Sequence, residues 1–227
     1  MSESKRKKVI LFLVEGYTDK ESLGLILSRL IDTSEVRFQI MAGDVTTSND
    51  PIPGIYKRVK AFLLRNRFKK SDILRIVQLI DTDGAFIDPS CVRYSDGKGI
   101  KYFDDRIETP APESIILRNE RKSESAGRLA KEELIFGIPY SIYYFSVNIE
   151  HVLHGVRGGL ESADKVRYSR KFVDSFADRP HDFVDFIRSD GIAVRGGYGE
   201  SWDYIFEGNH SLLRGSNLHL FFDPAEI

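Results

Sequence analysis

Short apolar runs alternate with amphipathic stretches over the first 80 residues of the chain. The largely apolar runs at 9–14, 36–41 and 73–80 are typical of strands buried in a parallel sheet. Between them, apolar residues recur at helical spacing from 23 to 31, and a second helix is predicted over 55–68. Strands that alternate with helices predict a doubly wound, mainly parallel α/β sheet.

The pattern becomes irregular after residue 85. Residues 86–114 contain Pro89, Pro110 and Pro112 and show no sustained period, which is typical of a lid, a binding loop or a mobile segment. A polar helix over 120–136, a fourth strand over 142–147 and further helices after it are predicted. We expect residues 1–154 to form a four-stranded sheet with flanking helices, with an insertion after the third strand at about 86–140. Residues 155–227 are expected to form a mostly helical C-terminal extension packed on this domain.

Composition excludes several classes of protein. The 41% apolar fraction is too high for a disordered chain, and the single cysteine, Cys91, excludes a disulfide framework and a thiolate-rich zinc site made by this chain alone. The longest apolar run, 9–14, is far shorter than a membrane span, and residues 1–8 lack the apolar part of a secretion signal. We therefore expect a cytoplasmic protein that does not enter the membrane.

The net charge bears on nucleic-acid binding. Lys plus Arg is 33 and Asp plus Glu is 34, a formal charge of -1, which argues against a nonspecific nucleic-acid coat protein. The charge is unevenly distributed, however, because cations dominate the segment between Lys57 and Arg75. A helix face this basic could follow a nucleic-acid backbone, and a solvated face is an equally good interpretation. The candidate nucleic-acid-binding residues are Lys57, Arg58, Lys60, Arg65, Arg67, Lys69 and Lys70.

Acidic residues follow the predicted strands. Glu15 comes after the first strand, Asp81 and Asp83 after the third, and Glu150 after the fourth, while Asp19 is four residues beyond Glu15. Ligands of parallel α/β sheets bind beyond the carboxyl ends of the strands, so these side chains are expected to lie close together. Crowded carboxylates repel one another unless a cation neutralises them, and oxygen ligands suit Mg²⁺.

Each acid also has an ordinary explanation when it is taken alone. A Glu before Gly often caps a helix, an Asp-x-Asp pair is common in loops, and Asp19 is favoured by the dipole of its helix. Thr18 and Glu21 fit a capping box at the same helix start. Two apolar strands that end in Glu15-Gly16 and in Asp81-Thr82-Asp83-Gly84 are much less expected by chance, and the joint pattern favours a site.

This joint pattern resembles the TOPRIM domain. The resemblance rests on Leu13-Val14-Glu15-Gly16-Tyr17-Thr18-Asp19 and on Leu79-Ile80-Asp81-Thr82-Asp83-Gly84. It covers roughly residues 9–154, apart from the segment 86–140. The form with Thr-Asp after Glu-Gly is most similar to the overcoming-lysogenization-defect nucleases and to small TOPRIM effectors of phage-defence systems.

The resemblance implies a metal-dependent endonuclease that cleaves or nicks DNA or RNA. Mg²⁺ or Mn²⁺ would be bound by Glu15, Asp81 and Asp83, and a second ion by Asp19 and Glu150, with Glu15 as an alternative general base. Lys131 is the candidate for neutralising the leaving group, although a solvated helix charge explains it as well. A homodimer is among the expected assemblies.

The resemblance further implies a role as the toxic effector of an anti-phage or abortive-infection system. The sequence has no Gly-x-x-x-x-Gly-Lys-[Ser/Thr] loop, so a separate ATPase is the expected partner. A non-catalytic regulatory subunit with a vestigial acidic site is the alternative outside enzyme chemistry.

One of the two motifs also fits a second class of enzyme. Asp81-Thr82-Asp83-Gly84-Ala85 after an apolar strand resembles the first motif of haloacid-dehalogenase phosphatases, in which the first Asp is a covalent nucleophile. That motif usually opens its domain, whereas a strand ending in Glu15-Gly16 precedes it here. The nuclease interpretation is therefore preferred over the phosphatase.

Overall fold

Strands and helices alternate over the first part of the chain, up to Asp81, and helices dominate after the last strand, which ends at Phe145. The computed structural model describes residues 8–31, 36–40, 46, 48, 50–157 and 162–223. The strands are β1 (Val9–Val14), β2 (Val36–Ile40), β3 (Ile73–Asp81), β4 (Val92–Tyr94), β5 (Lys101–Tyr102), β6 (Ile107–Thr109), β7 (Leu134–Ile135) and β8 (Ile138–Phe145). The helices are α1 (Tyr17–Leu30), α2 (Pro51–Asn66), α3 (Pro112–Leu129), α4 (Ile149–His154), α5 (Ser162–Phe176), α6 (Pro180–Arg188) and α7 (Tyr198–Phe206).

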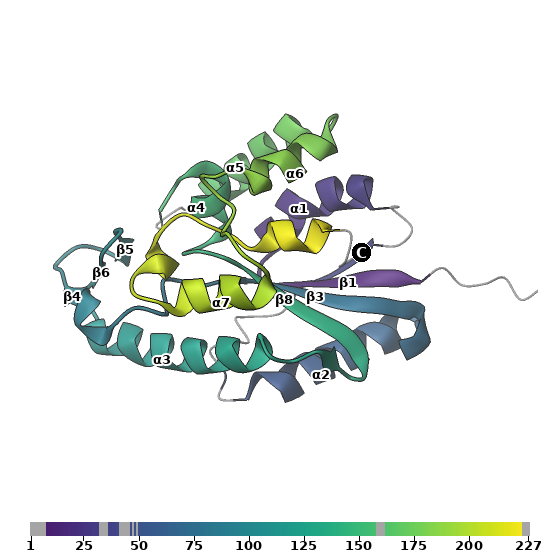
Figure 1. The fold of residues 1–227 in the computed structure, drawn as a ribbon, viewed down its shortest axis with the longest axis horizontal. Coiled ribbons are helices and arrows are strands. Elements are labelled where there is room, and N and C mark those ends of the chain that lie inside the picture. Colours follow the sequence, from purple (N-terminus) through teal and green to yellow (C-terminus); the bar gives the residue numbers. More distant parts are fainter. Residues whose placement is uncertain are drawn as a thin grey trace, which may run out of the picture.

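The central sheet has five strands in the order β2-β1-β3-β8-β7 (Figure 1). β1 pairs in parallel with β2 and β3, and β3 pairs in parallel with β8. β7 is antiparallel to β8, so the sheet is mixed. The α/β class expected from the sequence is confirmed, and the sheet has an additional edge strand that the apolar pattern did not predict.

A tight hairpin adds β7 to the edge of the sheet. Only Phe136 and Gly137 separate β7 from β8, and both have positive φ angles, 57° and 63°. Two successive residues with positive φ are the conformation of a two-residue turn whose twist matches that of paired strands. Because β7 has only two residues, its sequence shows no alternation from which a strand could be predicted.

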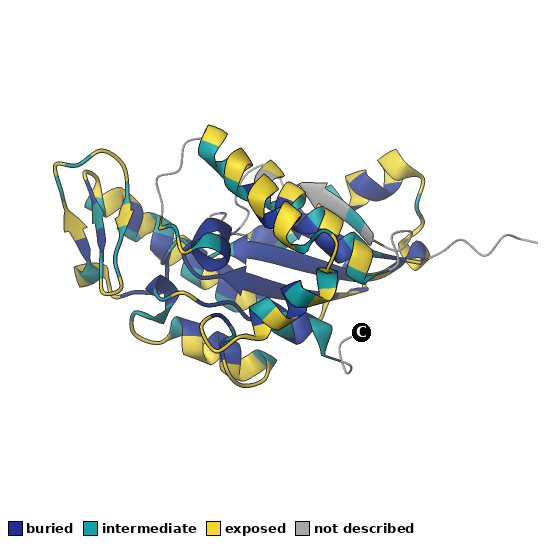
Figure 2. Ribbon diagram, turned by 90° about the horizontal axis from the view of Figure 1, so that it is seen from above, coloured by how far each residue is buried: buried dark blue, intermediate teal, exposed yellow. Residues whose placement is uncertain are grey.

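Helices cover both faces of the sheet, and side chains alternate between the two layers along each strand. In β1, Leu11 and Leu13 point to the face covered by α2, α3 and α7, whereas Phe12 and Val14 point to the face covered by α1, α5 and α6. All four are completely buried. Figure 2 shows the buried strands between helices whose outer faces are exposed. The predicted burial of these strands on both sides is therefore confirmed.

The insertion after β3 contains a small sheet and a long helix. β6 lies between β4 and β5, parallel to β4 and antiparallel to β5. α3 then returns along the underside of the central sheet, beside α2 (Figure 1). The small sheet has its own apolar cluster, in which Val92 and Ile107 pack against Leu212 from the C-terminal part of the chain.

Two helices begin earlier than predicted because each has proline in its first turn. α2 begins at Pro51 and α3 at Pro112, whereas helices were predicted over 55–68 and 120–136. α3 also ends earlier than predicted, at Leu129, so that β7 lies where a helix was expected. Proline is well accepted at a helix start, since the first N–H groups have no partner within the helix. α3 has 18 residues but is polar, and none of the helices in the described residues is long and apolar enough to cross a bilayer.

The C-terminal part of the chain packs on β8 through specific hydrogen bonds. The Tyr198 hydroxyl bonds to both the N–H and the carbonyl of Ile142, at 3.2 and 3.0 Å. The N–H of Tyr144 donates to Asn217 Oδ1, and Ser216 Oγ donates to the Tyr144 carbonyl. Helix α7, which the sequence analysis did not predict, thereby becomes part of the same core as the strands.

Candidate active site

Four carboxylates gather at the carboxyl edge of the central sheet. Glu15 follows β1, Asp19 lies in the first turn of α1, Asp81 ends β3, and Asp83 is two residues further on. Burial raises the pKa of Asp81 well above its usual range, and repulsion from Asp19, Glu15 and Asp83 raises it further. These groups therefore act on one another, as the strand-end positions predicted.

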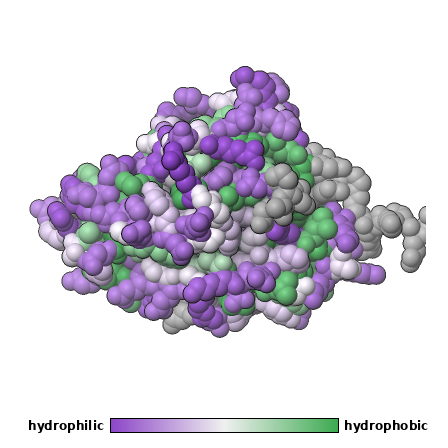
Figure 3. Space-filling model, in the orientation of Figure 1, coloured by the Kyte–Doolittle hydropathy of each residue, from purple (hydrophilic) through white to green (hydrophobic). Residues whose placement is uncertain are grey.

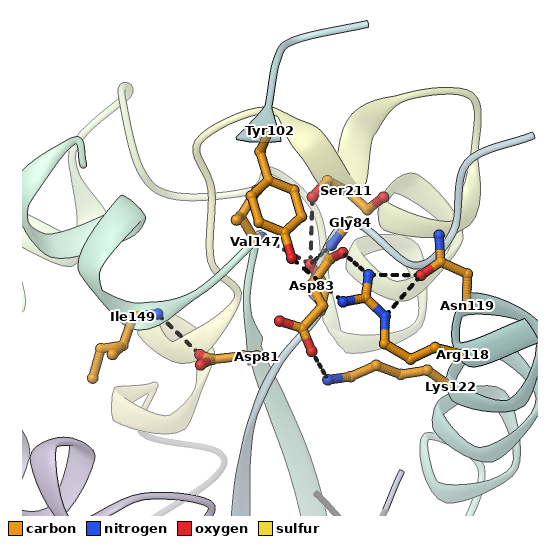
Figure 4. A network of polar contacts seen from close by, with 11 residues as sticks. Asp81, Asp83, Gly84, Tyr102, Arg118, Asn119, Lys122, Val147, Ile149 and Ser211 are labelled. Carbon is orange, nitrogen blue, oxygen red and sulfur yellow. Dashed lines mark hydrogen bonds and ion pairs between the residues drawn. The ribbon is translucent and has the colours of Figure 1, made fainter. Parts of the chain in front are cut away.

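Asp81 and Asp83 have different partners although they are only two residues apart. Asp81 Oδ1 accepts a hydrogen bond of 2.9 Å from the N–H of Ile149 at the start of α4. Asp83 Oδ2 lies 2.6 Å from the Nζ atom of Lys122 on α3. The chain leaves the extended conformation here, because Asp83 has a positive φ of 51°. Asp83 therefore lies in a turn and no longer belongs to the extended strand that Asp81 ends (Figure 4).

The loop that carries the two aspartates is fixed by hydrogen bonds from distant segments. Thr82 is buried, and its Oγ1 accepts from the N–H of Val147 at 2.8 Å and donates to the carbonyl of Ser211 at 3.3 Å. The N–H of Asp83 donates to the carbonyl of Val147 at 2.7 Å. Groups that are held in this way need little rearrangement when a ligand binds.

Gly84, the last residue of the Asp-Thr-Asp-Gly motif, has a packing role. Its φ is +64°, and a Cβ at this position would lie 2.5 Å from Leu212 Cδ2. A side chain would therefore be strained by the backbone and would also overlap Leu212. The glycine lets the Asp81–Gly84 turn pack closely against the C-terminal part of the chain.

Asp19 caps the helix that follows Glu15. α1 begins at Tyr17, with Gly16 as the N-cap, and Asp19 Oδ2 accepts a hydrogen bond of 2.8 Å from the N–H of Gly16. This pairing replaces the predicted capping box of Thr18 and Glu21, because the helix begins one residue before Thr18. One carboxylate oxygen of Asp19 is thus engaged by the backbone beside Glu15.

Helix α3 places two cations at the aspartates. Lys122 is completely buried, although its ammonium group forms the ion pair with Asp83. Arg118 Nη2 donates to the Asp83 carbonyl at 2.8 Å, and the same guanidinium binds Asn119 Oδ1 and the Tyr102 hydroxyl (Figure 4). Lys122 lowers the pKa of Asp81 and so partly offsets the repulsion among the acids. Neither cation was among the site residues predicted from the sequence, because both come from the segment 86–140, which the TOPRIM resemblance does not cover.

Lys131, the lysine selected from the sequence, lies elsewhere. It is exposed in the turn after α3 and lines a hollow together with Arg75 and Tyr140. Arg75 lies near the beginning of β3, whereas Asp81 is its last residue. The structure therefore places Lys131 toward the opposite edge of the sheet from the aspartates.

Glu150 lies on α4 next to Ile149, whose N–H binds Asp81. The Glu150 side chain is buried, and its Oε1 lies 3.3 Å from Lys165 Nζ on α5. Its Oε2 is also buried and has no hydrogen-bond partner among the described residues. Glu150 is thus close in sequence to the group that holds Asp81 but pairs with a cation of its own.

The basic segment predicted to contact nucleic acid lies mainly on α2. Most of its cations are exposed, and Arg58 is half-buried. Arg67, Lys69 and Lys70 follow the end of α2 and precede the first residue of β3. Lys70 lies over the ring of Phe136 in the β7–β8 hairpin. This part of the basic segment is therefore at the edge of the sheet opposite to Asp81.

The donor set at the carboxyl edge fits a hard divalent cation by its chemistry. Carboxylate oxygens are the ligands that Mg²⁺ and Mn²⁺ prefer. The pKa of Asp81 is raised first by burial and then by repulsion from Asp19, Glu15 and Asp83, and a cation would relieve the repulsion. Within the described ranges, no three His, Cys, Asp or Glu side chains are close enough together to form an ion-binding group. The fit therefore rests on the kind of donors and on their mutual repulsion.

His151 and His154, on α4 beside Glu150, take part in packing. His151 is buried, its Nδ1 lies 3.3 Å from the Ser146 carbonyl, and its Nε2 accepts from Arg157 Nε at 3.1 Å. Burial lowers the pKa of His151 to about 4, so its ring is neutral near pH 7. His154 packs against the rings of Tyr168 and Phe172.

Comparisons with protein-family models, with curated proteins and with solved structures gave no match for the chain. The TOPRIM resemblance therefore remains a resemblance of two short motifs. The function has to be argued from the geometry at the carboxyl edge of the sheet.

Proposed function

We propose that this protein is a metal-dependent nuclease of the TOPRIM type, which hydrolyses or nicks phosphodiesters of DNA or RNA. The observation that carries the proposal is the cluster of Glu15, Asp19, Asp81 and Asp83 with the buried cation Lys122 beside it. Repelling carboxylates next to a fixed ammonium group suit a ligand that combines a divalent cation with a phosphate. The two sequence motifs that resemble TOPRIM contain these same four acids.

Glu15, Asp81 and Asp83 are the residues that would hold Mg²⁺ or Mn²⁺, with Asp19 beside them. When bound, such an ion supplies Lewis-acid stabilisation of phosphoryl charge and lowers the pKa of water. We leave Glu150 outside this set because Lys165 already pairs with its carboxylate. The backbone bond from Ile149 to Asp81 and the bond from Gly16 to Asp19 orient two of the acids before any ligand arrives.

Lys122 and Arg118 are proposed to face the phosphate in place of Lys131. The Lys122 ammonium is positioned by Asp83 at 2.6 Å, and Arg118 is positioned by Asn119 Oδ1 and the Asp83 carbonyl. Cations that are fixed in this way stabilise negative charge on the transferring phosphoryl group with little reorganisation. Glu15 is proposed either as an ion ligand or as the base that accepts a proton from the attacking water.

A role as the toxic effector of an anti-phage system with a separate ATPase is proposed on the resemblance alone. A homodimer is proposed on the same resemblance. DNA and RNA are both kept as candidate substrates. Phosphodiester cleavage can be tested with the purified protein and nucleic acid alone, whatever its biological role or assembly.

The test incubates the purified protein with supercoiled DNA, linear DNA, tRNA and rRNA, each with Mg²⁺, Mn²⁺ or EDTA. We expect cleavage of at least one substrate with a metal ion, no cleavage in EDTA, and loss of cleavage in the Asp81→Ala variant. Equal cleavage by Asp81→Ala and wild type, or no cleavage of any substrate, would contradict the proposal. Thermal unfolding of both proteins shows whether a loss of cleavage reflects unfolding.

A further inference from the structure

A groove between α1 and α5 opens beside the acidic cluster. It has a volume of about 280 Å³ and is lined by residues of both helices, Tyr17, Glu21, Leu25, Val166, Ser169, Arg170, Val173 and Asp174. Tyr17 is two residues from Glu15 and two from Asp19. At the other side, α5 also carries Lys165, the partner of Glu150. The end of the groove at Tyr17 is therefore close along the chain to two of the clustered acids.

Three large apolar side chains in this groove are exposed. Tyr17 is 61% exposed, Leu25 43% and Val166 40%, although the visible surface over α5 and α6 is mainly hydrophilic (Figure 3). Glu21, one turn further along α1, raises the pKa of the Tyr17 hydroxyl through hydrogen bonding and charge repulsion, so the two side chains lie close together. The groove thus presents a flat aromatic ring and two aliphatic side chains that nothing in the described residues covers.

Cations of α5 continue the groove on its outer side. A second hollow of about 560 Å³ shares Val166, Arg170 and Asp174 with the groove and adds Arg167 and Lys171. The two hollows together present three cations, Arg167, Arg170 and Lys171, against two carboxylates, Glu21 and Asp174, and all three cations lie on α5. The Arg167 guanidinium lies 5.6 Å from the centre of the Tyr168 ring. An apolar floor is therefore continuous with a cationic rim.

Ser169 adds an unused hydrogen-bonding group to the groove. It is 5% exposed, and its Oγ has no hydrogen-bond partner among the described residues. A buried hydroxyl without a partner is unfavourable, and a polar atom of a ligand would satisfy it after a small movement of the side chain. This is a second and independent feature that points to a ligand in the groove.

We propose that the α1–α5 groove binds a single-stranded segment of the nucleic-acid substrate and leads its backbone to the carboxylates. Bases pack on Tyr17, Leu25 and Val166, while Arg167, Arg170 and Lys171 contact phosphates. Aromatic platforms next to a line of cations are the general means of binding single strands, because every base has a flat face. A duplex hides those faces inside its stack and would leave the apolar floor uncovered. This inference rests on the proposed nuclease function and names the form of its substrate.

The test is binding of labelled single-stranded and duplex oligonucleotides, DNA and RNA, by fluorescence anisotropy in EDTA, so that binding is measured apart from cleavage. We expect Tyr17→Ala and Arg170→Ala each to weaken single-strand binding about tenfold, which is the scale of one lost base stack or phosphate contact. Tyr17→Phe keeps the ring and should bind close to wild type. The matched controls are Tyr94→Ala and Arg179→Ala, which remove an exposed tyrosine and an exposed cation outside the groove.

Three results would overturn the groove as the binding site. They are no binding of single strands by wild type, tighter binding of duplex than of single strands, and loss of binding in Lys60→Ala on α2 with none in Arg170→Ala. Single-strand binding that depends on Tyr17, without any cleavage in metal, would uphold the groove and contradict the nuclease. Metal-dependent cleavage at the wild-type rate in both Tyr17→Ala and Arg170→Ala would uphold the nuclease and contradict the groove. Equal thermal stability of the variants shows that lost binding is not lost fold.

Discussion

Lys122 Nζ lies 2.6 Å from Asp83 Oδ2, and the side chain has no exposed surface. A buried ammonium group is costly unless it is paired, and Lys122 has Asp83 as its partner. Lys122 in turn lowers the pKa of Asp81 and so moderates the repulsion within the cluster. Lys131 is solvated and lies toward the other edge of the sheet. Lys122 therefore belongs to the candidate site, whereas Lys131, the lysine predicted from the sequence, does not.

Replacing Lys122 should cost far more activity than replacing Lys131. We expect Lys122→Met to lower the cleavage rate by about 100-fold, as for other fixed groups that stabilise developing charge. Lys131→Met should retain nearly the wild-type rate, because the side chain is exposed and distant from Asp83. The measurement is the initial rate of cleavage in Mg²⁺ or Mn²⁺. A loss of activity in Lys131→Met with a fully active Lys122→Met would reverse the assignment.

Because Lys122 is buried, its replacement also affects the fold, and the two effects have to be separated. Removing one partner of a buried ion pair leaves an uncompensated charge, here on Asp83, which costs about 3–5 kcal/mol when the pair is fully buried. Asp83 is partly exposed, so the loss of unfolding free energy should be smaller. Rates are therefore compared at a temperature at which thermal unfolding shows both variants to be folded.

Substitution of two glycines tests the backbone conformation of two single elements, the β7–β8 hairpin and α7. Gly137 has a φ of +63° in the β7–β8 turn, whereas Gly199 lies inside α7 and an added Cβ there meets nothing within 4 Å. Gly137→Ala should lower the free energy of unfolding by about 1 kcal/mol, since left-handed backbone is unfavourable for alanine. Gly199→Ala should raise it by about 0.5 kcal/mol, because alanine restricts the unfolded chain and favours helix.

Urea denaturation of the two glycine variants provides the measurement. Changes of opposite sign are expected for these chemically identical substitutions. If both variants were destabilised equally, α7 would not be helical at Gly199. If neither were destabilised, the positive φ at Gly137 would be wrong, and with it the hairpin that makes the sheet mixed.

Which elements could be predicted depended on the length and regularity of their patterns. The buried strands β1 and β3 were located within one residue of their ends, because both of their faces are apolar. α2 and α3 were predicted to begin late, since Pro51 and Pro112 were taken as loop residues although they stand at helix starts. The helix predicted over 120–136 was wrong at 134–135, where the two residues of β7 are too few to show the alternation of a strand, and α7 follows a glycine-rich segment and was not predicted.

The candidate site was predictable only in its acidic half. Glu15, Asp81 and Asp83 follow strands, and the ends of parallel strands meet at one edge of the sheet. Lys122 and Arg118 are separated from their partner Asp83 by 39 and 35 residues, across an insertion without a regular pattern. Charged residues on a polar helix resemble any solvated face in the sequence, and only the packing of α3 shows which of them point inward.

For the molecule as a whole, residues far apart in the chain build one edge of the sheet. The turn with Asp81 and Asp83 is held by Val147 after β8 and by Ser211 near the C-terminus. The insertion supplies the cations, α1 supplies Asp19, and α5 supplies the groove proposed for the substrate. This convergence explains how a chain with a net charge of -1 can place both an acidic cluster and basic surfaces at a single site.

The most direct test of the central claim uses Glu15, which belongs to the proposed nuclease centre but has no place in a phosphatase built on Asp81 alone. Wild type and Glu15→Gln are compared for metal-dependent cleavage of the best nucleic-acid substrate and for hydrolysis of a phosphomonoester. The account predicts that wild type cleaves the nucleic acid but not the monoester, and that Glu15→Gln lowers cleavage by about 100-fold while remaining folded. Wild-type rates of cleavage in Glu15→Gln, or a monoester as the better substrate of wild type, would contradict it.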